Sequence, residues 1–502
     1  MANQADTPLL TALKACAQQA EAVFYAPGHK RGQGSPVALV DLVGRSLLQA
    51  DLPELPALDN LFAPTGVIQA AQDLAAEAFG ARQTWFLANG STAGMIAAIL
   101  ATCPPGRKLI LPRNCHQSAI AGLILSGALP LFVTPAYDPT SDLVGGLTAT
   151  AVAEALHHHP DAAAILLLAP TYQGISTDVR AIAELAHAHS IPLLVDEAHG
   201  PHFGFHPDLP PAALACGADL SVQSTHKVLS ALSQAAMLHL NSDRIDPHRI
   251  QSALQLVQST SPNYILLASL DAARQQIATE GHSLMQRTLD LAQALRSRLQ
   301  TLPYLTLLQP NAPPFRSPGF SHLDPTRLTI ITPSLGLSGF ALDTWLQERG
   351  VTAELPTQHH LTFILSLGNT QADCDRLYQA LSQFKLETST WKLQTSVKAG
   401  FNKDPGMSDT GWVNPVPTVQ PFPLSPREVY FGPQTVVPIA AAIGRISAEW
   451  VCPYPPGIPV LLPGEQITET AVECLQQVLN QGGVITGCRD PHLQTLTVAA
   501  IA

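Results

Sequence analysis

The sequence predicts an α/β fold in which a mostly parallel sheet is covered by helices on both faces. Between about residues 80 and 240, short apolar runs alternate with helix-length segments, which is the pattern of successive β-α-β units. The turns that follow these runs carry most of the region's polar residues, and open α/β sheets place their ligand sites there. The chain has 502 residues, several times a typical domain length, so smaller units are expected beside this body.

Six strands are expected within this region. Each is an apolar run of strand length bounded by polar residues, Gly or Pro. In chain order they are residues 84–88, 109–111, 129–133, 164–168, 192–195 and 219–223. Helices are expected at 95–102 and 179–189, and the segment 250–300 predicts long helices that lead to a smaller region.

Four domains are predicted along the chain. They are an N-terminal arm at 1–35, a large α/β domain at 36–310, a small-domain segment at 311–400 and a C-terminal domain at 401–502. A Pro-rich stretch predicts an extended crossover before a last apolar unit that begins near Arg427. Its prolines are Pro405, Pro415, Pro417, Pro421, Pro423 and Pro426.

The composition excludes some partners and favours self-association. The 27 Lys and Arg against 38 Asp and Glu give a net charge of −11, which lacks the basic footprint of a nucleic-acid binder. Charged residues make up only 13% of the chain and hydrophobic residues 46%, so much of the surface must be buried between subunits or be formed by Ala and Pro. We therefore expect a homo-oligomer that binds a small molecule and no nucleic acid.

No membrane span or export signal is expected. The uncharged run Gln117–Tyr137 is long enough to cross a bilayer, but Ser126, Gly127 and Pro130 divide it into a helical half and a strand-like half. The first residues have no basic segment followed by an apolar one. The eight cysteines form no CxxC pair, which favours buried thiols in a reducing cytoplasm.

A lysine and an aspartate stand at the ends of two expected strands. Lys227 closes the segment Val222-Gln-Ser-Thr-His-Lys227, and Asp196 lies 31 residues earlier, about one β-α-β unit away. Alone, Lys227 is most simply a solvated surface amine. Together, the pair suits pyridoxal phosphate, whose chemistry needs an amine to form a Schiff base and a carboxylate that keeps the pyridine nitrogen protonated.

A phosphate cradle is the third requirement of that cofactor. The segment Asn89-Gly90-Ser91-Thr92 joins an expected strand to an expected helix, and the backbone amides at such a helix start hold phosphate. The simpler alternative is an ordinary helix N-cap.

Two histidines are further candidate site residues, and several other motifs are excluded. His116 follows the second strand and is predicted to stack on the cofactor ring, with helix capping as the alternative. His199 follows Asp196 by three residues and is predicted near the cofactor or the substrate, with a structural role as the alternative. Asp-Glu-Ala-His also spells a helicase box, but the chain has no Walker A loop, no metal-binding His or Cys spacing and no nucleophile elbow.

These segments resemble the fold type I pyridoxal-phosphate decarboxylases of ornithine, lysine and arginine. The resemblance extends over nearly the whole chain. It is carried by Ala26–Gly32, Asp51–Pro56, Asn89–Thr92, Arg113–Ser118, Pro170–Gly174, Asp196–Gly200 and Ser224–Lys227, and at the C-terminus by Gly444–Glu449, Pro453–Pro459 and Pro463–Glu465.

The resemblance implies a role for each of these positions. Lys227 becomes the Schiff-base lysine, Asp196 the pyridine partner and His116 the stacking residue. Ser91, Thr92, Ser224 and His226 would lie near the phosphate. His29 and Lys30 would belong to an N-terminal arm that reaches a neighbouring subunit of a homodimer with sites at its interface. Glu465 would receive the cationic end of the substrate, since a cation taken out of water needs a carboxylate; its alternative is a turn carboxylate.

The chain departs from the longer enzymes of that family at its beginning. It reaches Pro27-Gly-His-Lys30 almost at once, without a receiver-like wing domain, so it resembles the short biosynthetic branch. We therefore expect a dimer or tetramer rather than a decamer.

The expected reaction is decarboxylation of a basic amino acid, with arginine favoured over lysine and ornithine. It would give agmatine and carbon dioxide and supply polyamine biosynthesis. Two alternatives remain open at this point: another fold type I reaction, such as that of α-oxoamine synthases or aminotransferases, and a cofactor-binding protein without catalysis. The orientation of the bond to be broken selects among such reactions, and the sequence does not show that orientation.

Overall fold

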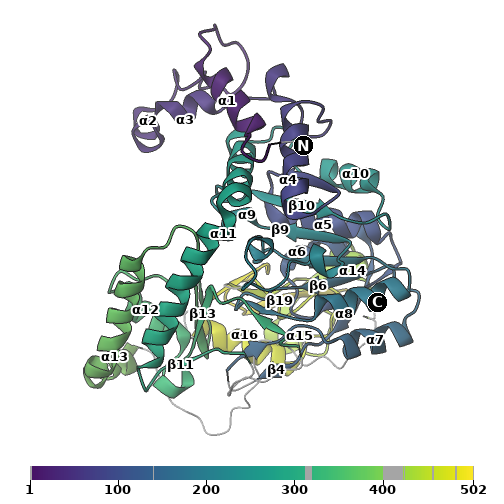
Figure 1. The fold of residues 1–502 in the computed structure, drawn as a ribbon. Helices are drawn as coiled ribbons and strands as arrows, with labels where there is room; N and C mark the ends of the chain where they lie inside the picture. The colour runs from purple at the N-terminus through teal and green to yellow at the C-terminus, as the bar shows by residue number, and fades with distance from the viewer. Residues whose placement is uncertain are drawn as a thin grey trace. The chain divides into compact units, whose positions relative to one another are not determined.

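The computed structural model describes residues 3–138, 141–310, 319–398, 422, 424–454, 457–480 and 483–500, with side chains up to residue 384 in the third segment. It contains two compact units, which are treated separately. Unit 1 comprises Met1–Thr102 and Ala186–Gln286, and unit 2 comprises Cys103–Leu185 and Arg287–Ala502 (Figure 1). The predicted boundary at residues 400 and 401, the prolines 405–423 and part of the 453–459 block lie outside the described residues. The four domain boundaries stay a prediction.

Unit 1 contains four strands in the order β1-β10-β9-β8. β8 (Leu193–Asp196) and β9 (Leu220–Gln223) run parallel, whereas β10 (Ala236–Leu240) is antiparallel to both β9 and β1 (Gln83–Leu87). The carboxyl ends of β8 and β9 therefore lie side by side, as the spacing of Asp196 and Lys227 predicts.

Helices pack around these strands of unit 1. Before β1 come α1 (Pro8–Gln18), α2 (Val37–Val43), α3 (Arg45–Ala50), the 3-10 turn η1 (Pro56–Leu58) and α4 (Val67–Phe79); after it come α5 (Gly90–Thr102), η2 (Phe203–Phe205), η3 (Leu214–Cys216), α9 (Thr225–Val228), α10 (Pro247–Val257) and the start of α11 (Tyr264–Gln300). Leu9 and Leu13 of α1 belong to the same buried cluster as Phe86 of β1 and Tyr264 of α11. The N-terminal helix is thus part of the hydrophobic core of unit 1.

The crossing of α5 over the sheet depends on a glycine. A Cβ atom at Gly94 would lie 2.7 Å from Leu87 Cδ1 and 2.8 Å from Val222 Cγ1. Because real Cβ contacts are longer than this, only glycine lets α5 pack at this depth against β1 and β9.

Unit 2 contains the parallel strands β6-β2-β3 and several antiparallel pairs. In its first segment lie β2 (Lys108–Pro112), α6 (Gln117–Ser126), β3 (Leu129–Val133), β4 (Tyr137–Asp138), β5 (Leu143–Val144), α7 (Ala149–His158), β6 (Ala164–Leu168), β7 (Ile175–Ser176) and the start of α8 (Val179–Ala188). The uncharged run 117–137 thus folds as α6 and β3, as its sequence predicts. Among the described residues no helix has both the length and the hydropathy needed to cross a membrane.

The second segment of unit 2 builds two further cores. The sheet β11-β13-β15-β14 packs on α11, α12 and α13 around Trp345 and Phe363 (Figure 1). The elements of this part of the chain are β11 (Thr306–Leu307), β12 (His322–Leu323), β13 (Arg327–Ile331), η4 (Pro333–Leu335), α12 (Gly339–Gln347), β14 (Leu355–Pro356), β15 (His360–Ile364) and α13 (Gln371–Lys398). Of these, β12 pairs with β7 rather than with this sheet. The C-terminal part contains α14 (Pro426–Phe431), β16 (Gln434–Pro438), α15 (Ile439–Ala442), β17 (Cys452–Tyr454), α16 (Glu469–Asn480), β18 (Val484–Thr486) and β19 (Thr495–Ala499). Its core includes Leu475 of α16 and Val498 of β19.

The six predicted strands are confirmed as β1, β2, β3, β6, β8 and β9, and the predicted helices as α5, α8, α10 and α11. The sequence reading missed β10. Its apolar run Ala236–Leu240 pairs antiparallel with two neighbours, so it does not belong to the β-α-β alternation used to find the others.

Candidate active site

Lys227 lies in the short helix α9, directly after β9. Its Nζ atom is 2.9 Å from His199 Nε2. The helix is fixed by two local bonds, in which the Lys227 N–H donates to Ser224 O at 3.1 Å and the His226 N–H donates to Ala235 O at 3.2 Å. His226 Nδ1 also lies 3.0 Å from Ala235 O. The amine is therefore half-buried and held against an imidazole, which does not fit the alternative of a solvated surface lysine.

Asp196 is the last residue of β8 and is only 7% exposed. Its Oδ1 accepts a hydrogen bond from the Ala198 N–H at 3.2 Å. Burial raises the pKa of Asp196, and the nearby Lys227 ammonium and the Ala198 N–H oppose that rise. The structure thus brings the predicted carboxylate and amine close enough to interact electrostatically.

The predicted phosphate segment joins β1 to α5. Gly90 has φ +73°, a left-handed conformation that favours glycine, and lets the chain turn into the helix. Asn89 Oδ1 accepts from the Ser259 N–H at 3.2 Å, and the Ser224 hydroxyl donates to the Ser91 hydroxyl at 2.7 Å. The start of α5, with Ser91 and Thr92, therefore lies beside the turn that precedes Lys227.

These residues fit pyridoxal phosphate. An amine, a buried carboxylate and a pair of hydroxyls at a helix start are present in one unit, and together they are the groups that this cofactor requires. The Thr225 hydroxyl adds an observation. It is fully buried and has no hydrogen-bond partner among the described residues, as expected of a donor that awaits a ligand.

His116 belongs to unit 2, where it caps α6. Its Nδ1 accepts from the Ser118 N–H at 3.2 Å and lies 2.9 Å from the Ser118 hydroxyl. A Cβ atom at Gly457 would lie 3.6 Å from His116 Nε2, so the C-terminal part of unit 2 approaches this ring closely. The capping alternative is confirmed, and stacking on the cofactor stays a prediction.

Glu465 is 3% exposed and is paired with Arg113. Arg113 Nη2 donates to Glu465 Oε2 at 2.9 Å and to Val460 O at 3.0 Å, and Nη1 donates to Pro459 O at 2.9 Å. Burial raises the pKa of Glu465, while Arg113 lowers it. The pair ties the β2–α6 loop to the 459–465 segment. The predicted role of Glu465 in binding a substrate cation stays a prediction.

His29 and Lys30 lie in the N-terminal segment of unit 1. His29 Nε2 is 3.0 Å from Asp51 Oδ2, and its Nδ1 accepts from the Gly32 N–H at 2.9 Å. Lys30 Nζ donates to the Tyr25 carbonyl. Both side chains are engaged within their own segment, and their predicted role at a neighbouring subunit's site stays a prediction.

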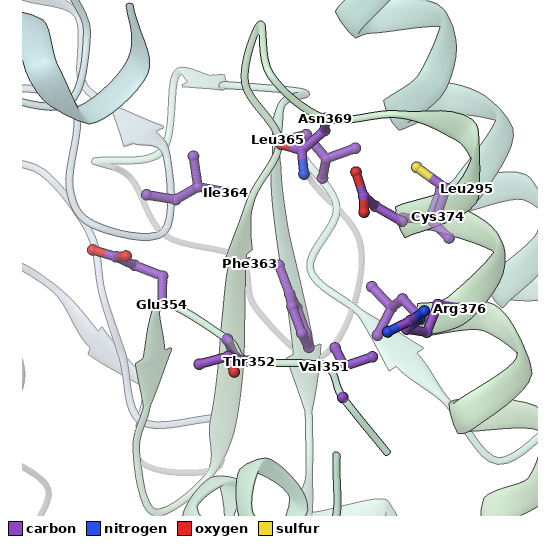
Figure 2. A pocket seen from close by; sticks show the side chains of 14 residues that line it. Leu295, Val351, Thr352, Glu354, Phe363, Ile364, Leu365, Asn369, Cys374 and Arg376 are labelled. Atoms are coloured by element: carbon purple, nitrogen blue, oxygen red, sulfur yellow. The ribbon is translucent and has the colours of Figure 1, made fainter. Parts of the chain in front are cut away.

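A cavity of about 450 Å³ lies elsewhere in unit 2. It lies beside β15 and α13, with Phe363, Cys374 and Arg376 in its wall (Figure 2). None of the predicted site residues lines it.

The sequence reading overlooked two residues of the site region. Arg113 lies within a motif that was recognised but was given no role. Glu197 follows Asp196, is 1% exposed, and accepts three hydrogen bonds inside unit 1. A charged residue at the end of an all-apolar strand was the available signal for it.

Comparison with solved structures defines the class of protein. The fold is similar to the constitutive lysine decarboxylase of Escherichia coli, with a TM-score of 0.82 and 23% identity over 99% of this chain and 82% of that one. It is more distantly similar to an alanine–glyoxylate aminotransferase from Nostoc, with a TM-score of 0.53 and 20% identity over 67% of this chain and 91% of that one. The fold is thus that of pyridoxal-phosphate enzymes of fold type I.

Sequence comparison then gives the family. Residues 7–373 match the major domain of Orn/Lys/Arg decarboxylases and residues 424–482 match their C-terminal domain. The arginine decarboxylases of Bacillus subtilis and Halalkalibacterium halodurans are 37% and 36% identical, each over 99% of this chain and 98% of the relative. The constitutive lysine decarboxylase of Escherichia coli is 26% identical over 94% of this chain and 77% of its own. The chain belongs to the Orn/Lys/Arg decarboxylase family, whose members depend on pyridoxal phosphate.

Proposed function

We propose that this protein is a pyridoxal-phosphate-dependent decarboxylase of arginine, which releases carbon dioxide and forms agmatine for polyamine biosynthesis. The observation that carries the chemistry is the Lys227 amine, 2.9 Å from His199, in the same unit as the buried carboxylate of Asp196. The preference for arginine is supported by the full-length similarity to arginine decarboxylases, which exceeds the similarity to lysine decarboxylases. This similarity does not favour the alternatives of another fold type I reaction or of a protein without catalysis.

The chain's own residues supply the attachment and the charge control. Bound pyridoxal phosphate would supply the electron sink that accepts the electron pair left when the α-carboxylate departs as carbon dioxide. Lys227 would hold the cofactor, and Asp196 would hold a proton on its pyridine nitrogen, because a buried carboxylate keeps its charge only beside a partner. His199 would position the Lys227 amine and exchange protons with it, so that this pair returns a proton to the α-carbon.

The phosphate would be held at the start of α5. Ser91, Thr92, Ser224 and His226 are the proposed neighbours, with Asn89 and Gly90 shaping the turn. Backbone amides at a helix start attract an anion, and hydroxyl donors add to that attraction. We propose in addition that His116 stacks on the cofactor ring.

The guanidinium end of arginine is proposed to approach Glu465. That carboxylate already pairs with Arg113, so it would have to share its charge between two cations. The planar guanidinium of arginine can stack parallel to the Arg113 guanidinium while both approach the carboxylate of Glu465. The ammonium of lysine is a point charge and cannot stack in this way.

We also propose that the protein is a homodimer or a tetramer of such dimers, active in the cytoplasm. Helix α2 supports the self-association, because its sequence is largely apolar and yet none of its residues is buried within this chain. Val37 is 75% exposed, Leu42 81% and nearby Phe24 92%. Apolar side chains gathered in one segment mark an interface. His29 and Lys30 of the same N-terminal region would then reach the neighbouring subunit's site. All eight cysteines lie among the described residues as thiols, which supports a reducing compartment.

The reaction is tested directly with three substrates. The purified protein with pyridoxal phosphate is incubated with equal amounts of arginine, lysine and ornithine, and agmatine, cadaverine and putrescine are measured by mass spectrometry. Agmatine is expected as the main product. Lys227→Ala should abolish it, whereas Lys14→Ala, which removes an exposed lysine of α1, should not.

Each alternative has its own result. Cadaverine or putrescine as the main product would overturn the arginine assignment and leave the reaction class intact. A cofactor absorbance band without any of the three amines would overturn decarboxylation of these substrates.

A further inference from the structure

A second acid, Glu197, lies buried next to Asp196 and takes no part in the proposed chemistry. Its Oε1 accepts from the Ala213 N–H at 2.7 Å, and its Oε2 accepts from the Ser221 hydroxyl at 2.7 Å and from the Gln223 side-chain amide at 2.9 Å. Among the described residues, these three donors and no acceptor are hydrogen-bonded to this carboxylate. Such a set suits the ionised form and would be left partly unsatisfied by a neutral replacement.

The hydrogen bonds continue from Glu197 across the sheet of unit 1. Gln223 Oε1 lies 3.2 Å from His239 Nε2, and His239 Nδ1 lies 2.8 Å from the Thr84 hydroxyl. The four side chains come from the end of β8, from β9, from β10 and from β1. Each is 4% exposed or less. The chain of hydrogen bonds thus joins all four neighbouring strands of unit 1 in its buried interior.

Burial raises the pKa of Glu197 to about 7. Above that pH the ionised carboxylate sets the direction of every bond in this chain. Because Glu197 only accepts, Gln223 must turn its NH2 group toward it and its oxygen toward His239. His239 must then carry its proton on Nε2, which leaves Nδ1 to accept from the Thr84 hydroxyl. Burial lowers the pKa of His239 to about 3, so this imidazole stays neutral at physiological pH. One charge therefore fixes the tautomer of a histidine two strands away.

The strands joined in this way carry the active-site groups at their ends. β8 ends in Asp196, and the turn that follows it holds His199. β9 leads into Ser224 and Lys227. The side chain of Glu197 also packs against the turn that holds His199, because a Cβ atom at Gly200 would lie 2.9 Å from Glu197 Cγ. The Gly200 N–H in turn donates to Glu197 O at 2.9 Å.

We propose that Glu197 is a positioning residue which, through Gln223, His239 and Thr84, holds four neighbouring strands in register and so aligns Asp196, His199 and Lys227. The inference rests on the proposed function for its catalytic consequence, but the hydrogen-bond chain exists without it. A misplacement of about 1 Å at a reacting group costs on the order of 100-fold in rate. The effect of losing Glu197 should therefore appear in kcat and hardly in KM.

The first experiment tests the chain of hydrogen bonds by measuring the tautomer of His239, without any reaction. The full-length protein, free of cofactor and labelled with 15N-histidine, is examined by NMR, and His239 is assigned by the loss of its signals in His239→Asn. At about pH 8.5, where Glu197 is ionised, the wild type is expected to show the neutral Nε2–H form. In Glu197→Gln the amide can donate to Gln223, which then flips and donates to His239, so the Nδ1–H form is expected. An unchanged tautomer in Glu197→Gln would overturn the proposed chain.

The second experiment tests, by enzyme kinetics and absorbance of the holoenzyme, whether Glu197 aligns the active-site residues. Glu197→Gln is expected to lower kcat by about 10- to 100-fold with KM within about 3-fold, and to shift the pH midpoint of the cofactor absorbance band. Glu197→Gln with Gln223→Glu keeps one carboxylate and one amide in contact and should recover at least 10-fold of the loss. Glu280→Gln makes the same change at an exposed site of α11 and should match the wild type.

The outcomes separate the two proposals. A wild type that makes no amine overturns the proposed function, while the tautomer and the absorbance band still report on Glu197. A kcat within 2-fold of wild type in Glu197→Gln, or no recovery in the double variant, overturns the positioning role. If Glu197→Gln does not fold, Gln223→Met removes the amide that links Glu197 to His239; an unchanged His239 tautomer balance and an unchanged kcat in that variant would also overturn it.

Discussion

The buried pair Arg113–Glu465 offers a strong test of how unit 2 is held together. Replacing Arg113 with Met keeps most of the side-chain volume and removes the guanidinium. The exposed fractions of the two side chains are 3% and 4%, so the lost donor lies away from bulk solvent. The variant leaves a buried carboxylate and two backbone carbonyls, those of Pro459 and Val460, without their partner.

The expected cost follows from these three losses. Breaking a buried ion pair by removing one partner costs about 3–5 kcal/mol. The carbonyls would add to this, but protonation of Glu465, whose pKa burial already raises, recovers part of it. Unit 2 has about 300 residues, and a domain of that size loses about 5–8 °C in Tm for 3–5 kcal/mol. We therefore expect Arg113→Met to melt about 5–8 °C below the wild type.

Two further variants separate charge balance from packing. Arg113→Met combined with Glu465→Gln removes both charges and should be more stable than Arg113→Met alone, since no unpaired carboxylate remains. Arg107→Met removes an exposed arginine of the same unit and should stay within about 1 °C. Melting is followed by differential scanning calorimetry at fixed cofactor concentration, together with hydrogen exchange of the 457–467 backbone. A loss below 2 °C for Arg113→Met, with unchanged exchange in that segment, would refute the reasoning.

Three other changes have defined outcomes. Burial raises the pKa of Glu197 to about 7, so between pH 4.5 and 7 the folded chain keeps a proton that the unfolded chain has lost. The protonated group therefore contributes to the free energy of unfolding in full below pH 4.5, and this contribution is lost as the pH rises through 7. Urea unfolding from pH 5 to 8 should therefore show the wild type losing up to about 3 kcal/mol relative to Glu197→Gln, and a constant difference would contradict this. Arg274→Met should lower the free energy of unfolding by about 3–5 kcal/mol, because it leaves the fully buried carboxylate of Asp271 without its cation. Asp271 accepts from the Leu9 N–H of α1, so hydrogen exchange of α1 should become faster; unchanged exchange would show that the pair does not anchor this helix. Gly339→Ala should cost about 2–4 kcal/mol in a denaturant titration, since its Cβ would lie 2.1 Å from a carbonyl oxygen, while Gly368→Ala, with open space around it, should cost less than about 1 kcal/mol; equal costs would contradict the crowding.

The strands were predictable because burial on both faces leaves a local mark. A parallel strand between two helix layers must be apolar at nearly every position, so a run such as Ala164–Leu168 identifies itself without its neighbours. β10 is equally apolar, but its antiparallel pairing with β1 and β9 is a property of three segments far apart in the chain. The apolar run of β10 is visible in the sequence, but its pairing with β1 and β9 can be seen only in the folded structure.

Part of the site was predictable for a related reason. Asp196 and Lys227 follow strands separated by one β-α-β unit, and such strands are commonly neighbours in a parallel sheet, so the pairing of β8 with β9 could be expected. Arg113 and Glu465 are 352 residues apart, and no local pattern links a β2–α6 loop to a turn near the C-terminus. The recognition of both motifs therefore did not reveal that they bind each other.

Asp196 and Glu197 illustrate what decides the role of an acid. They are consecutive at the end of β8, so their side chains leave the strand toward opposite faces. Asp196 interacts with the Lys227 amine, and Glu197 meets the polar faces of β9 and β10. That second face had a sequence signal, because Ser221 and Gln223 are polar at alternate positions of a strand that is otherwise apolar. Period-2 polar residues inside a fully buried strand require a partner within the fold, and an acid at the end of the adjacent strand is the group that satisfies them. The same reasoning, applied to His239 on β10, extends the polar face to Thr84 and predicts that these positions act as one unit rather than as separate core residues.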